Sequence, residues 1–488
     1  MRRIISTFVV AAAGALLVAA APAGAAATAD RLAGPTRYET AVVAGTAAFT
    51  SATDAVVARG DTFPDALAAS ALAGSVDGPI LLTEPHAVPA ATRGALARLG
   101  VRRVHVVGDE TAVGADVEAA LRTDGYEVRR YGGATRYDTA ARVADAVGAA
   151  PALDGKRTVF VASGESFADA LAAGPVAFSG PYPLLLTARA ALSPAAADSI
   201  RRLTPERVVL LGGLAAVSGD VERALHDLAP EVHRYGGRDR SETAALVAWL
   251  AHDQLGWPNT EIDLARGDLF PDALAAAPHA ARHRAPVLLT SGPTDLGVRT
   301  RLFLEAELDR VAAFHVLGDQ SAISDTVVDA ARTAATKGAV CPPPSQIHTG
   351  QQDNDPRICV TMHLENHTAV TYSGSFRGTV RIENRSGDTI PLDPKPYQCA
   401  ISGALFTNGE STGGNPDTCP PPITALAPHE VRTYDFVLDT CNGGTVNSCF
   451  EGYSVVGLFD AAVGLVAGGP DVYRQVQYPV QQPVLVFE

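Results

Sequence analysis

Three arginines and three aspartates recur along this chain at matching positions. Arg37, Arg136 and Arg240 lie about one hundred residues apart, and an aspartate follows each of them about thirty residues later. A guanidinium group donates a planar fork of hydrogen bonds that fits phosphate or carboxylate oxygens. The arginines are therefore candidate ligands for an anionic molecule. The competing interpretation is structural, an Arg-to-Asp tie between the first two helices of each copy.

Two further arginines carry the same two interpretations. Arg59 and Arg266 directly follow an expected strand, and Ser163 occupies the matching position of the second copy. Because open α/β sheets bind ligands beyond the carboxyl ends of their strands, all of these positions are plausible binding positions. The predicted ligand-binding residues are Arg37, Asp65, Arg136, Asp169, Arg240, Asp272, Arg59 and Arg266.

Catalytic and nucleotide-binding motifs are weak. Gly-Glu-Ser-Thr-Gly at residues 409–413 has the letters of a nucleophile elbow, but its Asn, Gly and Pro neighbours predict a turn-rich loop. The glycine turns that follow the expected strands lack the full G-x-G-x-x-G pattern of dinucleotide-binding proteins. We therefore expect no enzyme activity and no cofactor.

Two groups of histidines have spacings that could hold a metal ion. His279 and His283 share a helix face, but no Glu follows the first histidine as in H-E-x-x-H, so we expect both to face solvent. His363, Glu365 and His367 would share one face of a strand, which a solvent-exposed surface explains equally well. The prediction is that no metal is bound.

All cysteines fall in the last third of the chain. In an exported protein an even number of cysteines predicts up to three disulfides, whose pairing the sequence leaves open. Zinc is the alternative, but the spacings are not C-x-x-C. The six residues are Cys341, Cys359, Cys399, Cys419, Cys441 and Cys449.

The first residues are typical of a secretory signal peptide. Arg2 and Arg3 precede an apolar run, and small residues around positions 23–27 offer cleavage sites. An uncleaved membrane anchor is the alternative, and no later run predicts a membrane span. The 39 basic and 53 acidic residues give a net charge of −14, which argues against nucleic-acid binding.

The arginines and aspartates belong to three copies of one unit. Arg-Tyr-Glu-Thr, Arg-Tyr-Asp-Thr and Arg-Ser-Glu-Thr begin at the three repeated arginines. Each copy then contains a second marker, Phe-Pro-Asp-Ala-Leu or Phe-Ala-Asp-Ala-Leu. A third marker, Pro-Ile/Leu/Val-Leu-Leu-Thr, comes next, and the fourth is an expected strand that ends in glycine. Four markers that keep their order three times indicate an internal repeat of about one hundred residues.

The elements that position these residues alternate within each copy. In the first copy, apolar runs at residues 55–58, 80–82 and 104–107 alternate with Ala-rich helical segments at 40–49, 66–72, 90–99 and 117–121. Such continuous apolar strands predict a parallel sheet covered on both faces. The fold class is therefore α/β, with three tandem Rossmann-like three-layer repeats in a pseudo-threefold arrangement.

This set of motifs resembles the type 2 cell wall binding repeats, which occur in threes in surface proteins of Gram-positive bacteria. The resemblance spans residues 29–337. It implies non-covalent attachment to an anionic secondary cell wall polymer, while another domain carries the protein's individual function. Ser241 replaces the tyrosine found as Tyr38 and Tyr137, and Ala168 replaces a proline, so the three copies are not expected to bind equally.

A different composition begins after Lys337. Alternating segments at residues 358–364, 379–382, 434–438 and 453–458 are separated by turn clusters, which predicts an immunoglobulin-like β-sandwich. The predicted organisation is a signal peptide (1–29), repeats at 30–129, 130–233 and 234–337, a linker (338–357) and the sandwich (358–488).

We expect a secreted protein, anchored to the Gram-positive wall, that displays its sandwich for binding or adhesion. The alternatives are a wall hydrolase or modifier of a wall-lytic amidase, and a protease inhibitor or host-protein binder acting through the sandwich.

Overall fold

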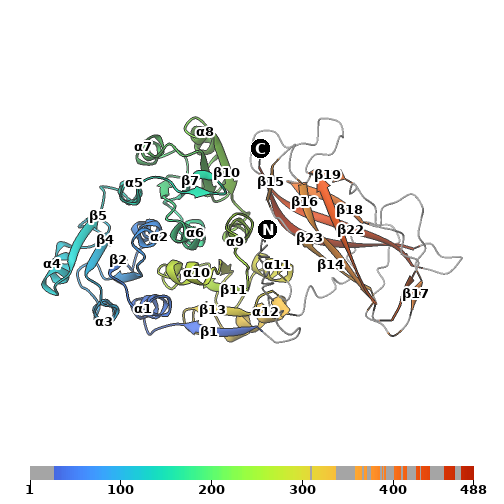
Figure 1. The fold of residues 1–488 in the computed structure, drawn as a ribbon, viewed down its shortest axis with the longest axis horizontal. Helices are drawn as coiled ribbons and strands as arrows, with labels where there is room; N and C mark the ends of the chain where they lie inside the picture. Colours follow the sequence, from blue (N-terminus) through green and yellow to red (C-terminus); the bar gives the residue numbers. More distant parts are fainter. Residues whose placement is uncertain are drawn as a thin grey trace, which may run out of the picture.

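Residues 27–336 form three α/β lobes built around parallel sheets (Figure 1). The computed structural model describes residues 27–307 and 310–336, together with separate strand segments between residues 358 and 487. The central strands are apolar along their length, and all four residues of strand β3 are buried. Such strands need helices on both faces of the sheet, which is the architecture predicted from the repeats.

The helices and strands follow the same order in each lobe. The first lobe contains α1 (Arg37–Ala48), β2 (Asp54–Arg59), α2 (Pro64–Val76), β3 (Ile80–Thr83), α3 (Ala90–Leu99), β4 (Arg103–Val107), α4 (Ala115–Thr123) and β5 (Glu127–Tyr131). The second contains α5 (Arg136–Val147), β6 (Ala152–Leu153), β7 (Lys156–Ser163), α6 (Ala168–Ser179), β8 (Leu184–Thr187), α7 (Pro194–Leu203), β9 (Arg207–Leu211), α8 (Gly219–His226) and β10 (Glu231–Tyr235). The third contains α9 (Arg240–Leu255), β11 (Glu261–Arg266), α10 (Ala277–His283), β12 (Val287–Thr290), α11 (Val298–Ala306), β13 (Ala313–Leu317) and α12 (Asp325–Thr336).

The strand that opens each sequence repeat completes the sheet of the preceding lobe. The first sheet has the strand order β3-β2-β4-β5. The second sheet has the equivalent order β8-β7-β9-β10, and the short strand β6 also pairs with β7, antiparallel to it. The third sheet is β12-β11-β13-β1, where β1 (Thr28–Leu32) pairs in parallel with β13 and places Asp30 opposite His315. The N-terminal strand therefore closes the three lobes into a ring.

Helices α2, α6 and α10 meet at the centre of the ring (Figure 1). Small side chains allow this: a Cβ on Gly74 would lie 2.1 Å from the carbonyl oxygen of Phe178. In the turns that lead to these helices, Phe63, Phe167 and Phe270 form a nearly equilateral triangle, with ring centroids 5.5 to 5.7 Å apart. The triangle lies where the three equivalent turns converge.

Polar caps set where the first helix of each lobe begins. The hydroxyl of Thr36 accepts a hydrogen bond from the Tyr38 amide, and Thr135 forms a capping box with Asp138. In the third lobe the carboxylate of Asp239 accepts from the amide of Glu242. Because these caps immediately precede the repeated arginines, each arginine is the first residue of its helix.

The C-terminal segments are β-strands. They are β14 (Ile358–Leu364), β15 (Thr368–Val370), β16 (Ser375–Asn384), β17 (Ile390–Pro391), β18 (Ile401–Thr407), β19 (Glu410–Gly414), β20 (Ala425–Leu426), β21 (Val431–Asp439), β22 (Val455–Ala467) and β23 (Arg474–Phe487). Four of these strands overlap the four predicted segments. The immunoglobulin-like arrangement stays a prediction.

Several sequence predictions lie outside the described residues. They include the targeting segment up to residue 26 and five of the six cysteines, while the sixth, Cys359, is described only as part of a strand. The alternative metal site at His363, Glu365 and His367 also lies outside the described residues at Glu365 and His367. Within the described part of the chain, no helix is both long and apolar enough to cross a membrane.

Candidate functional site at the junctions between the lobes

The repeated arginines hold the turn that follows the first strand of their own lobe. The guanidinium of Arg37 donates to the carbonyl oxygen of Gly60 at 2.9 Å. Arg136 and Arg240 donate in the same way to Gly164 and Gly267, both at 2.6 Å. Arg37 is partly buried, whereas Arg136 and Arg240 are exposed. A guanidinium has five N–H donors, so a bond to one carbonyl leaves it able to bind another acceptor.

The repeated aspartates face the next lobe around the ring. The Asp65 carboxylate accepts a hydrogen bond from the side chain of Thr139, in the first helix of the second lobe. Asp169 accepts from Thr243 of the third lobe, and Asp272 accepts from Thr40 of the first. Burial raises the pKa of all three carboxyl groups, and the threonine hydrogen bonds oppose that rise. These contacts join each lobe to its successor.

The predicted tie between an arginine and an aspartate of the same copy is therefore wrong. Among the helix-start arginines, the one whose charge favours ionised Asp65 is Arg136 of the following lobe, and Arg240 and Arg37 act likewise on Asp169 and Asp272. We call the three sites the 1–2 junction, the 2–3 junction and the 3–1 junction, after the lobes that they connect. The sequence could not show this because the repeat is the same whether a partner lies within a copy or in its neighbour.

Arg59 and Arg266 are engaged by carboxylates of their own turns. Arg59 forms two hydrogen bonds with Asp61, one of them at 2.9 Å, and Arg266 binds Asp268 at 2.6 and 2.8 Å. The arginine lowers the pKa of its partner in each case. An anionic ligand would have to compete with these carboxylates, so the pairs are weaker candidates for ligand binding than the three helix-start arginines.

The three junctions differ in charge. Arg59 contributes positive charge near Asp65 at the 1–2 junction, and Arg266 does so near Asp272 at the 3–1 junction. The corresponding residue of the 2–3 junction is Ser163, whose hydroxyl accepts a hydrogen bond from the amide of Glu165. The 2–3 junction thus lacks the second turn arginine of the other two.

A further set of arginines has a structural role that the sequence analysis did not assign. Arg130 donates to the carbonyl oxygens of Gly108 and Val113 and pairs with Glu118. Arg234 repeats this arrangement in the second lobe, and Arg31 does so across the ring closure in the third. Their recurrence at the first position of the repeat motif was the available signal.

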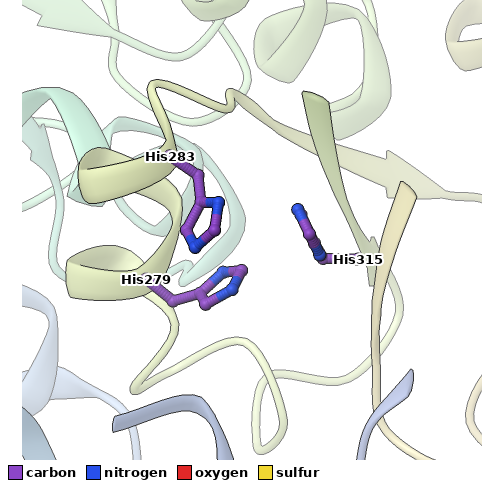
Figure 2. A group of neighbouring side chains, drawn as sticks. All are labelled: His279, His283 and His315. Atoms are coloured by element: carbon purple, nitrogen blue, oxygen red, sulfur yellow. The ribbon is translucent and has the colours of Figure 1, made fainter. Parts of the chain in front are cut away.

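His279 is buried, contrary to the prediction that it faces solvent, and His283 is only partly exposed. His279 is only 2% exposed, and its ring packs against those of His283 and His315, with centroids 4.4 and 4.7 Å away (Figure 2). His315 comes from β13, so a helix-face argument could not include it. The signal that could have found the cluster is a histidine at a helix position where the other two copies have apolar residues.

The predicted loop around Ser411 is also wrong. Residues Glu410–Gly414 form strand β19, which pairs antiparallel with β18 and places Ser411 opposite Phe406. A nucleophile elbow needs its serine at a sharp turn between a strand and a helix. Ser411 lies inside a strand, so its setting does not match that motif.

The folds, the repeats and the three junctions together define a module of three linked α/β lobes. The chain belongs to the cell wall binding domain 2 (CWB2) family, whose pattern matches residues 31–118, 130–222 and 234–328. CWB2 domains bind cell wall polymers, which implies a location at the cell surface.

Two curated Bacillus subtilis (strain 168) proteins are similar to this chain. N-acetylmuramoyl-L-alanine amidase LytC is 28% identical over 299 residues, which cover 61% of this chain and 57% of the relative. Amidase enhancer is 28% identical over 260 residues, which cover 53% of this chain and 34% of the relative. The matched region therefore spans from one third to just over half of these relatives.

Two solved structures from Clostridium difficile share the fold. Cwp8 has a TM-score of 0.56 and 25% identity over 63% of this chain and 52% of that chain. Cwp6 has a TM-score of 0.58 and 22% identity over 72% of this chain and 53% of that chain. The similarity to Cwp6 supports the fold alone.

Proposed function

We propose that this protein is an exported, non-catalytic wall-binding protein of the Gram-positive surface. Its three lobes hold it to an anionic secondary wall polymer, and its C-terminal domain is displayed for binding or adhesion. The observation that carries the proposal is the presence of three CWB2 domains whose helix-start arginines recur around one ring. Repetition of one cationic group suits a ligand that is itself repetitive.

The junction arginines are the proposed contacts with the polymer. Each guanidinium is anchored by one glycine carbonyl, which fixes its position without neutralising its charge. The net charge of −14 gives no general attraction for an acidic polymer, so binding depends on these local positive groups. Added salt should weaken the interaction because it screens exposed charges.

Sedimentation with purified cell walls tests the proposal. The full chain and residues 27–337, which keep strand β1 intact, should sediment with the walls, and residues 338–488 should stay in solution. Simultaneous replacement of Arg37, Arg136 and Arg240 by alanine should reduce retention at least tenfold if each contact contributes about 1 kcal/mol.

The control is a variant that also loses three arginines, but from helices away from the junctions. Arg93, Arg202 and Arg301 lie one in each lobe and are more than two-fifths exposed in their side chains. Their joint replacement by alanine should leave retention unchanged. Equal retention of the junction variant and the wild type would show that the arginines only hold the turns.

A role as a wall hydrolase or amidase modifier is the competing proposal, and similarity to an amidase and an amidase enhancer favours testing it. The pure protein should release no muropeptides from labelled walls, alone or added to a wall-lytic amidase. Release, or stimulation of the amidase, would favour that alternative. Capture of a protease or a host protein by residues 338–488 would instead favour the inhibitor or host-binding role.

A further inference from the structure

Three histidines of the third lobe converge between helix α10 and the sheet. His279 and His283 lie one turn apart on α10, and His315 approaches them from β13 (Figure 2). One ring nitrogen of each histidine lies within 4.8 Å of those of the other two. Three imidazoles at this separation form the donor set that zinc commonly takes.

Carboxylates from two strands orient the rings. Nδ1 of His279 lies 3.0 Å from an oxygen of Asp263, and Nδ1 of His283 lies 2.7 Å from an oxygen of Glu261. In metal sites a carboxylate commonly binds one histidine nitrogen in this way and directs the other toward the ion. In His279 and His283 the carboxylate contacts Nδ1, so Nε2 is the nitrogen that remains to bind an ion.

His315 is held by carboxylates at both nitrogens. Its Nδ1 lies 2.8 Å from Asp30 and its Nε2 lies 2.9 Å from the same Glu261 oxygen that contacts His283. One of these two contacts has to be exchanged for a metal bond. The contact with Asp30 involves β1, so the cluster also touches the strand that closes the ring.

The other lobes show that the fold does not require this polar cluster. In the second lobe the positions of Asp263, His279 and His315 are occupied by Phe160, Val176 and Val209, all of them buried and apolar. In the first lobe Val56 and Leu72 replace Asp263 and His279, and His105 is the equivalent of His315. The third lobe thus has ionisable side chains at positions where the second lobe has only apolar ones.

This exchange leaves a buried charge incompletely paired. Asp263 is 0% exposed, and its second oxygen, Oδ1, has no hydrogen-bond partner in the described structure. Asp30, Glu261 and Asp263 place three carboxylates around three imidazoles. A divalent cation would offset most of that negative charge, whereas a buried unpaired charge is costly.

From this geometry we propose that His279, His283 and His315 bind a zinc ion in the third lobe. Zinc–nitrogen bonds of about 2.0–2.1 Å in a tetrahedral site place the nitrogens about 3.3 Å apart. Nitrogens within 4.8 Å of one another reach that geometry by small side-chain rotations. His283 is about one-third exposed in its side chain, which gives the ion a route into the site.

Zinc binding by the full, untagged and oxidised chain tests the proposal. The protein is stripped with a chelator, dialysed against zinc and analysed for bound metal, and cobalt(II) is added separately as a spectroscopic probe. The wild type should retain one zinc in this lobe and give the visible absorption of tetrahedral cobalt. Glu261→Gln should lower zinc affinity about 10- to 100-fold.

The matched variant gives the third lobe the side chains of the first. Asp263→Val, His279→Leu and His283→Val together install the equivalents of Val56, Leu72 and Val76, which the first lobe accommodates at these positions. It should retain one zinc fewer than the wild type, and His86→Ala, at an exposed histidine, should retain as much as the wild type. Equal zinc content in the triple variant and the wild type would overturn the proposal, and so would a cobalt spectrum that is the same in both chains. Because the cysteines are the same in both chains, zinc bound by them cancels from the comparison.

Discussion

Asp169 shows how one side chain can serve the fold while resembling a binding residue. Its carboxylate lies at a helix start near the end of a parallel strand, where ligands often bind, yet it is 6% exposed and accepts a hydrogen bond from Thr243. The hydroxyl of Thr243 is fixed in turn by the amide of Gly237 at 3.0 Å. The aspartate therefore joins the second lobe to the third.

Asp169→Ala and Asp169→Asn should separate this structural role from one that needs charge. Alanine removes the acceptor for Thr243 and should cost about 2 kcal/mol of unfolding free energy, whereas asparagine keeps an acceptor and should cost less than half of that. Urea unfolding measures both. Equal losses for the two variants would show that the carboxylate charge is essential.

The pH dependence of this comparison has a defined sign. Burial raises the pKa of Asp169, so this carboxyl group holds its proton in the folded protein to a higher pH than in the unfolded chain. The contribution of the aspartate to stability is fully present below its unfolded pKa and is lost as the pH rises through the raised folded pKa. Urea unfolding at several pH values should therefore show that the free energy of unfolding of the wild type rises relative to that of Asp169→Asn as the pH falls. A difference that does not change with pH would contradict this.

Strand β1 is the element that local sequence patterns could not place. The helix expected at residues 90–99 coincides with α3 (Ala90–Leu99), because helix period and capping are local signals. Parallel pairing of β1 with β13 connects Leu32 to Leu317 and has no signal near either residue. The junction contacts and the histidine cluster were missed for the same reason, since each joins residues of separate elements.

Arg31→Met should loosen the ring closure specifically. Arg31 donates to the carbonyl oxygens of Gly318 and Ile323 at 3.2 and 2.8 Å and pairs with Asp325 at 2.6 Å. Loss of these bonds should destabilise the third lobe by about 2 kcal/mol. Hydrogen exchange should become faster in β13 and α12 and remain unchanged in β4.

Arg129→Met is the control for this prediction. Arg129 lies in the equivalent strand β5, is 54% exposed in its side chain and pairs with Glu127 of the same strand. Its replacement should change exchange little in either lobe. Uniformly faster exchange in Arg31→Met would show that the ring unfolds as one unit, without a separate step for the third lobe.

At the scale of the whole molecule the three lobes share one fold but differ at their junctions. The repeat markers were sufficient to predict three similar α/β units, and Ser163 and Ser241 were already visible as departures. Their consequence depends on the neighbouring lobe: Arg37 and Arg266 both act on Asp272 at the 3–1 junction, whereas Arg240 acts on Asp169 at a junction where Ser163 replaces the turn arginine. The 2–3 junction therefore lacks a turn arginine, and its second positive charge comes from Arg234, which is paired with Glu222.

Arg37→Ala should reduce retention on cell walls more than Arg240→Ala. Linked lobes bind a repetitive polymer multivalently, so loss of a strong junction costs more than loss of a weak one. The measurement is sedimentation at several salt concentrations, after circular dichroism has shown that both variants are folded. Equal retention would favour the interpretation that these arginines serve only to hold the turns.

The ring closure also sets an order of events during synthesis. Strand β1 is made before the other strands of the ring, but its partner β13 follows only after more than two hundred and eighty residues have been added. The first lobe can complete its sheet as soon as β5 appears, whereas the third needs the oldest and the newest strands of the ring together. Residues 28–32 therefore remain without their strand partner until β13 has been made, which leaves a strand edge open to wrong pairing during that interval.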